Sequence, residues 1–187
     1  METQQLETPG GARLAWARPA VASRREVARG VLRELLVPEF GDVAFEQECA
    51  VCGSREHGPL RVVTPAGASV ARVSVSVSYA GPVAVVAVAP LGVTEFGIDA
   101  ETDSPRTRAA IAEALPDSPE PSIQTWTALE AVAKARGIGL RGDWQRADAR
   151  GFTVEHVTLP VGPGRPDADR WPIVVALAAR TRDATPR

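Results

Sequence analysis

The feature that most constrains this chain is the segment 71–89, which reads ARVSVSVSYAGPVAVVAVA. In residues 71–78 valine alternates with serine, and a period of two is the signature of a half-buried strand. The turn at 80–82 (AGP) leads into 83–89 (VAVVAVA), an apolar run typical of a buried strand. The run stops at Pro90, far short of the roughly 20 apolar residues of a membrane helix. The segment therefore predicts a β-hairpin.

Amphipathic helices are expected on both sides of this hairpin. One lies between Val21 and Leu36, carries apolar side chains four residues apart, and should end at Pro38 and Gly41. The other covers 123–136, with a capping serine before it and a glycine after it. The remaining expected elements are a short helix near 106–115 and strands at 12–18, 43–48, 60–64, 95–101, 152–158 and 173–179. This mixed order predicts an α+β fold.

Length and charge narrow the functional classes. A chain of 187 residues suits one domain or two packed half-units, which we place at 1–101 and 102–187. The 21 basic and 23 acidic residues leave a net charge of −2, which argues against binding of nucleic acid. An arginine stripe at positions 25, 29 and 33 is typical of a solvated helix face. The N-terminus METQQLETPG has no basic region followed by an apolar stretch, so we expect a cytoplasmic protein.

Four side chains have the pattern of a divalent-cation site. Asp99 and Glu101 are two residues apart in an extended segment and so lie on the same side of the chain. Glu130 could supply a third carboxylate, and Lys134, the only lysine of the chain, follows it by one helical turn. A hard cation needs such oxygen ligands and open positions for water and phosphate. The alternative is a pair of solvated acids beside an ordinary helix salt pair.

The cysteines and histidines are few. Cys49 and Cys52, with His57, resemble half of a zinc site. The only other histidine is His156, so no second ligand pair exists at a usable spacing, and the sequence argues against zinc. The same shortage argues against a Ser-His-Asp or Cys-His hydrolase. No phosphate-binding glycine fingerprint is present.

The order of four motifs resembles the 4'-phosphopantetheinyl transferases of the Sfp type. The motifs are CGSREHGP (52–59), VSVSYAGPVAVVAVA (75–89), FGIDAE (96–101) and WTALEAVAKARGIGL (126–140). The resemblance covers most of residues 20–142. It implies a phosphopantetheinyl transferase-like fold, in which two similar α/β half-units form a pseudo-dimer. It also implies an enzyme that moves the phosphopantetheine arm of coenzyme A to a serine of an acyl or peptidyl carrier protein. We expect a monomer.

The resemblance also implies roles at the reacting end of the site. Asp99, Glu101 and Glu130 would bind Mg²⁺. Glu130 would in addition be the general base for the carrier serine, and Lys134 would hold the transferred phosphate. Phosphoryl transfer relies on charge neutralisation and positioning, which this set of groups can provide.

Further positions correspond to the coenzyme-binding residues of the family. The implied coenzyme A contacts, besides Lys134, are Arg25, His57, Gly58, Pro59, Ser78 and Tyr79. Arg25 would meet the 3'-phosphate, the His57 to Pro59 turn would border the adenine, and Ser78 with Tyr79 would contact phosphates. The alternatives without a coenzyme contact are a surface arginine, a turn histidine and an ordinary strand serine.

Three departures from the family pattern keep other functions open. Tyr79 stands where the family carries a histidine, the basic residue that the family often carries between the glycine and the proline is missing after Gly58, and the stretch between Glu101 and Trp126 is short. These favour a non-catalytic or repurposed relative that binds coenzyme A or a carrier domain without transfer. A third hypothesis is a structural α+β domain without a ligand.

Overall fold

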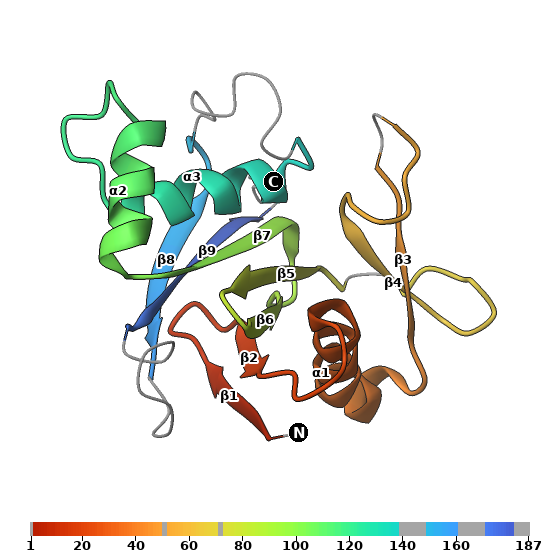
Figure 1. Ribbon diagram of the computed structural model, residues 1–187. Coiled ribbons are helices and arrows are strands. Elements are labelled where there is room, and N and C mark those ends of the chain that lie inside the picture. Colours follow the sequence, from red (N-terminus) through yellow and green to blue (C-terminus); the bar gives the residue numbers. More distant parts are fainter. Residues whose placement is uncertain (1, 50–51, 71–72, 139–148, 161–170, 182–187) are drawn as a thin grey trace, which may run out of the picture.

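A computed structural model describes residues 2–49, 52–70, 73–138, 149–160 and 171–181. Within these ranges the chain folds into a mixed structure of three helices and three antiparallel sheets (Figure 1). The α+β class is therefore confirmed. Among the described helices, none combines the length and apolar character needed to cross a membrane.

The first sheet has four strands in the order β1-β2-β6-β5. They are β1 (Thr3–Glu7), β2 (Arg13–Ala17), β5 (Val75–Ala80) and β6 (Val83–Val88). The predicted hairpin is confirmed, because Ala80 pairs with Val83 across the two-residue turn. Strand β1 was not predicted, since its sequence TQQLE has too few apolar residues to show a period.

Helix α1 (Arg24–Phe40) packs on this sheet and is longer than its sequence predicts. It begins after Ser23, whose side chain accepts a hydrogen bond from the backbone N–H of Glu26 in a capping box. The helix continues past Pro38 to Phe40, so that part of the expected end is wrong, while the end at Gly41 is confirmed. A proline removes one N–H from the helix, but the final turn is still closed by the N–H of Gly41, 3.0 Å from the carbonyl oxygen of Val37.

The other two sheets follow the same antiparallel pattern. The second sheet has the order β7-β9-β8, with β7 (Val93–Thr102), β8 (Thr153–Leu159) and β9 (Ile173–Thr181). Helices α2 (Pro105–Ala114) and α3 (Ile123–Ala135) lie beside it. The third sheet is the hairpin of β3 (Ala44–Gln47) and β4 (Leu60–Val63). All strands and helices expected between 12 and 179 are thus present, with shifted ends.

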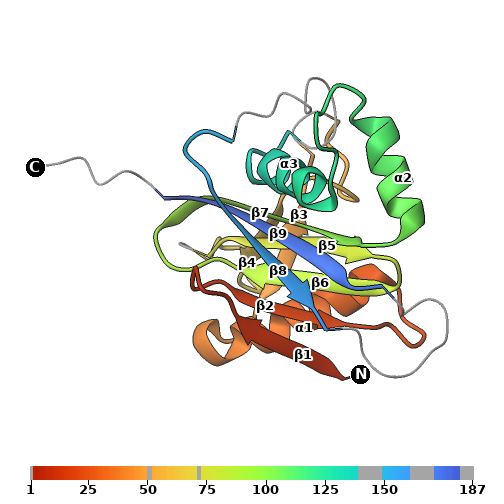
Figure 2. The same cartoon turned by 90° about the vertical axis from the view of Figure 1, so that its left-hand side faces the viewer.

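The two larger sheets form the middle of a layered structure. Leu14 and Val85 of the first sheet pack against Ile98 and Val175 of the second, and all four are fully buried. Helix α1 covers the outer face of the first sheet, and α3 covers the outer face of the second (Figure 2). The core therefore runs through the whole molecule from α1 to α3.

Serines join the two large sheets where β5 lies next to β7. The Oγ of Ser76 accepts a hydrogen bond from the N–H of Ile98 at 3.0 Å, and the Oγ of Ser78 accepts one from Ala100 at 3.1 Å. Both serines are buried, so β5 is more enclosed than the half-buried strand predicted from its alternation. It also begins only at Val75; of the predicted span, 71–72 lie outside the described residues. Between β5 and β7, serine side chains therefore accept hydrogen bonds that backbone carbonyl groups would accept within a sheet.

Candidate functional site

Three carboxylates converge where α3 crosses β7. Asp99 and Glu101 alternate with buried residues along β7, so both point toward α3, and Glu130 faces them from the helix. One carboxylate oxygen of each lies within 4.8 Å of the other two. Asp99 is 2% exposed and Glu130 is 7% exposed. The predicted acidic cluster therefore exists. The alternative of solvated acids is wrong for Asp99, while Glu101 is partly exposed.

Gly97 allows this close approach of helix and strand. A Cβ atom at this position would overlap the carbonyl oxygen of Ala131 and the backbone nitrogen of Ala135. Any larger residue would push α3 away from β7. The glycine two residues before Asp99 thus sets how near Glu130 comes to the strand acids.

Lys134 reaches the same cluster from the next turn of α3. Its Nζ lies 2.6 Å from Oδ1 of Asp99 and 4.0 Å from Oε2 of Glu130. It also donates a hydrogen bond to the Oγ of Ser78 at 3.1 Å, while that hydroxyl donates to Oδ1 of Asp99 at 2.9 Å. Asp99, Lys134 and Ser78 therefore form one polar network, in which Asp99 and Ser78 are buried and Lys134 is partly exposed.

The cluster places three carboxyl groups beside one lysine, which makes ionisation of all three unfavourable. Burial and the neighbouring Asp99 raise the pKa of Glu101 to about 7, against the opposing effects of Lys134 and a hydrogen bond with Trp126. Burial and Asp99 likewise raise the pKa of Glu130 to about 8. Oδ2 of Asp99 is buried without a hydrogen-bond partner among the described residues. An oxygen-ligand cation fits this arrangement, because it would occupy the orphaned oxygen and offset the repulsion.

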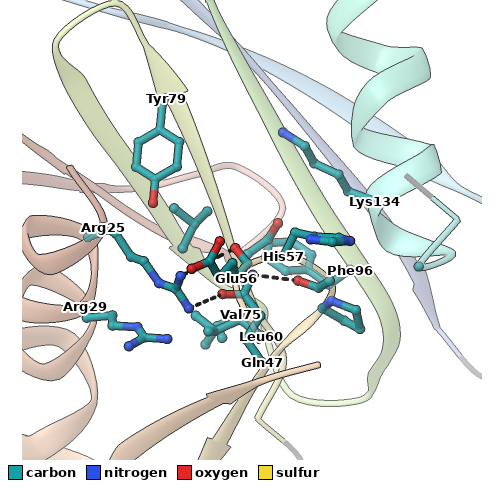
Figure 3. A pocket seen from close by; sticks show the side chains of 16 residues that line it. Arg25, Arg29, Gln47, Glu56, His57, Leu60, Val75, Tyr79, Phe96 and Lys134 are labelled. Carbon is teal, nitrogen blue, oxygen red and sulfur yellow. Dashed lines mark hydrogen bonds between the residues drawn. The ribbon is translucent and has the colours of Figure 1, made fainter. Parts of the chain in front are cut away.

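A pocket of about 350 Å³ opens beside the cluster (Figure 3). Arg25 and Arg29 enter it from α1, and Lys134 enters from α3 on the other side. The predicted residues His57, Gly58, Pro59 and Tyr79 also line the pocket. The pocket is thus basic at one end and reaches the acidic cluster through Lys134.

The arginines on α1 create the positive end. Arg25 donates hydrogen bonds to the carbonyl oxygen of Arg55 at 2.7 Å and to Oε1 of Gln47 at 3.1 Å, and so positions the loop before β4. Burial lowers the pKa of Arg29, and the charges of Arg25 and Arg33 add to this effect. A bound anion would stabilise the charged form of Arg29 and so offset this lowering of its pKa. The arginine stripe is therefore not simply a solvated face.

Ser78 and Tyr79 occupy different environments, although they are adjacent in β5. Tyr79 lines the pocket, where the guanidinium carbon of Arg24 lies 5.0 Å from its ring centroid. Burial raises the pKa of the Tyr79 phenol above its usual value, despite the opposing charges of Arg24, Arg25 and Arg29. The Ser78 side chain is instead engaged with Asp99 and Lys134. The predicted pair is thus split between pocket and acidic cluster.

Some pocket residues were not assigned to a ligand from the sequence. Arg29, Gln47 and Phe96 all line it. Arg29 carried a usable signal, since it follows Arg25 by one helical turn. Gln47 and Phe96 had no such signal because distant contacts bring them to the pocket.

The arrangement can bind an anionic ligand and a divalent cation next to each other. Arg25 and Arg29 suit phosphate oxygens, and the carboxylates suit a hard cation. Comparison with known proteins leaves the family undetermined: no protein-family model matches the chain, and no curated protein does.

Proposed function

We propose that this protein is a Mg²⁺-dependent 4'-phosphopantetheinyl transferase that uses coenzyme A and an acyl or peptidyl carrier protein. The observation that carries the proposal is the position of Lys134. It lines the basic pocket and also contacts the buried carboxylates Asp99 and Glu130. The motif resemblance requires Lys134 to lie between an anion pocket and a cation site.

The topology supports the proposed pair of half-units. In the first, strand β2 is followed by α1 and by the hairpin β5-β6, and β6 lies between β2 and β5. In the second, strand β7 is followed by α3 and by β8 and β9, and β9 lies between β7 and β8. With β1, the β3-β4 hairpin and α2 left aside, the order of strand, helix and two strands occurs twice. This supports two half-units that meet between β6 and β7, some residues before the proposed boundary at 101.

The pocket supplies the coenzyme contacts in this proposal. Arg25 and Arg29 bind phosphate groups from α1, and the turn His57 to Pro59 borders the adenine on the facing side. Tyr79 adds a neutral hydroxyl between them. Lys134 neutralises the pyrophosphate at the end nearest the acids.

The reacting groups follow from the cluster. Bound Mg²⁺, held by Asp99, Glu101 and Glu130, supplies charge neutralisation for the phosphates. Glu130 accepts the proton of the carrier serine, whose Oγ forms a bond to the phosphorus that carries the pantetheine arm. The bond from that phosphorus to the leaving phosphate oxygen breaks and releases adenosine 3',5'-bisphosphate. Ser78 keeps Asp99 and Lys134 in place through its hydrogen bonds.

A second candidate function is binding of coenzyme A without transfer. Tyr79 favours it, because burial keeps its phenol neutral and so removes the charge that a histidine could bring to a phosphate. The ion pair of 2.6 Å between Lys134 and Asp99 also favours it, because transfer requires the Lys134 ammonium at the phosphate and Asp99 already binds that ammonium.

The experiment is intact-mass spectrometry of several apo carrier proteins incubated with the protein, coenzyme A and Mg²⁺. We expect a mass gain of one phosphopantetheine arm, which Glu130→Gln and Lys134→Ala should abolish. Glu34→Gln, which changes an exposed glutamate on α1, is the matched control and should retain the gain. Calorimetric binding of coenzyme A without a gain on any carrier would favour the second candidate, and absence of both would overturn the two together.

A further inference from the structure

Two cysteines and a histidine meet at the rim of the pocket. One ligand atom each of Cys49, Cys52 and His57 lies within 4.8 Å of the other two. Sγ of Cys52 is 3.2 Å from Nε2 of His57. Neither cysteine forms a disulfide. This group is separate from the acidic cluster and has a different ligand chemistry.

The β3-β4 hairpin brings these residues together. Gln47 pairs with Leu60 at the end of the hairpin, so the chain that leaves β3 with Cys49 returns beside it with His57. Oε1 of Gln47 is held by Arg25, and its Nε2 donates to the carbonyl oxygen of Gly58 at 2.8 Å. The two ends of the loop are therefore tied to each other and to α1.

Backbone geometry brings the three ligands still closer. Gly58 has φ +108°, and a Cβ there would lie 2.6 Å from the carbonyl oxygen of Glu48. Only glycine permits this contact, which places His57 against the cysteines. On the other side, the N–H of Gly53 donates to the carbonyl oxygen of Cys49 at 2.8 Å and turns the chain back at Cys52. These two contacts hold the described residues on both sides close to the three ligand atoms.

Thiolate and imidazole ligands select zinc among the common divalent cations. In a tetrahedral site the sulfur and nitrogen ligands stand about 3.6 Å apart, as bond lengths of about 2.3 Å and 2.0–2.1 Å require. The ligand atoms here need only small side-chain movements to reach that spacing. Cys52 and His57 are exposed, so a fourth position is open to water. The sequence argument against zinc required a second ligand pair, but three protein ligands are sufficient for an open site.

We propose that Cys49, Cys52 and His57 bind one Zn²⁺ ion, with water as the fourth ligand. The ion ties the loop after β3 to the residues before β4. Because His57, Gly58 and Pro59 also line the pocket, the metal stiffens that rim. The proposal shares His57 with the proposed coenzyme pocket, but it does not depend on the transferase activity, since it rests on the geometry of the three ligand atoms.

The experiment is an anaerobic titration of the full chain, reduced with a phosphine, with Co²⁺ as a spectroscopic probe. We expect thiolate-to-cobalt charge transfer in the near ultraviolet, tetrahedral d–d bands in the visible, saturation at one equivalent, and bleaching by Zn²⁺. Cys49→Ser, Cys52→Ser and His57→Ala should each weaken binding by more than the roughly 10- to 100-fold that loss of an outer-shell partner costs.

Matched controls separate this site from the rest of the chain. His156→Ala removes the other histidine, which is exposed on β8, and should leave the titration unchanged, as should Glu34→Gln, which changes an exposed residue of α1. In the unaltered protein, Zn²⁺ should also slow alkylation of both cysteines by iodoacetamide at least tenfold, a test that requires no variant. Absence of charge transfer in the unaltered protein, unchanged binding by His57→Ala, or alkylation that Zn²⁺ does not slow would overturn the proposal.

Discussion

Nζ of Lys134 lies 2.6 Å from Oδ1 of Asp99, and the two groups form a largely buried ion pair between α3 and β7. A cation bound by the carboxylates would compete with Lys134 for Asp99. The same ammonium also faces the pocket, where an anion would compete with Asp99 for it. Binding of a cation and an anion should therefore favour each other at this point of the molecule.

The substitution Lys134→Met tests that competition. We expect it to tighten Mg²⁺ binding about tenfold, because the ammonium no longer repels the metal. Two unit charges 4 Å apart near a protein surface interact by roughly 4 kcal/mol, and a tenfold change needs only part of that energy. It should also weaken coenzyme A binding, because the anion loses a positive partner. Calorimetry with each ligand measures both effects. Weaker Mg²⁺ binding in a variant with an unchanged circular dichroism spectrum would contradict the competition.

Stability should depend on pH when divalent cations are removed. The pKa of Glu130 is raised from 4.5 to about 8, so the folded protein holds a proton that the unfolded chain has already released. The free energy of unfolding should therefore fall as pH rises from about 4.5 to about 8. Urea denaturation in the presence of a chelator, at several pH values across this window, measures the slope.

The variant Glu130→Gln assigns that slope to one side chain. It should reduce the pH dependence to the part that comes from Glu101, whose pKa is raised to about 7. It should also be more stable than the unaltered protein at about pH 8, because it removes one buried carboxylate that must ionise. The exposed Glu34→Gln should keep the original slope. If both variants show the same pH dependence, the buried carboxyl of Glu130 is not its source.

The two serines of β5 offer a paired test of the polar network. Ser76→Ala and Ser78→Ala each leave a buried backbone N–H of β7 without its acceptor, and each should cost about 1–3 kcal/mol of unfolding free energy. Only Ser78 also contacts Asp99 and Lys134, so only its substitution should change Mg²⁺ affinity. Thermal unfolding and Mg²⁺ calorimetry distinguish the two. Equal changes in metal affinity would refute the role given to Ser78.

Gly97→Ala tests the contact between α3 and β7. The added methyl group meets helix backbone, which cannot move without α3, so we expect a loss of about 1–3 kcal/mol or more together with weaker Mg²⁺ binding. Gly10→Ala is the matched control, because its methyl group meets the flexible carboxylate of Glu155, which can move aside. Chemical denaturation and Mg²⁺ titration provide the readouts. Mg²⁺ affinity that remains unchanged in Gly97→Ala would show that the helix position does not control the site.

Several elements of the candidate site could be predicted because their signals are local. The period of two along β7 places Asp99 and Glu101 on one side, and the helical period places Glu130 and Lys134 one turn apart. Both periods are properties of the backbone and require no knowledge of the rest of the fold. The coenzyme and cation assignments that rest on the motif order remain proposals.

The sequence by itself determined most of the elements, with the exception of β1, and the direction in which their side chains point, since these follow from residue types a few positions apart. Only the tertiary structure decided which elements meet. It brought α3 onto β7 at Gly97, turned Ser78 toward Asp99, and closed the β3-β4 loop so that His57 reaches Cys52. Those contacts join residues far apart in the chain or across a loop. They depend on close packing of whole surfaces, which no short window of sequence encodes.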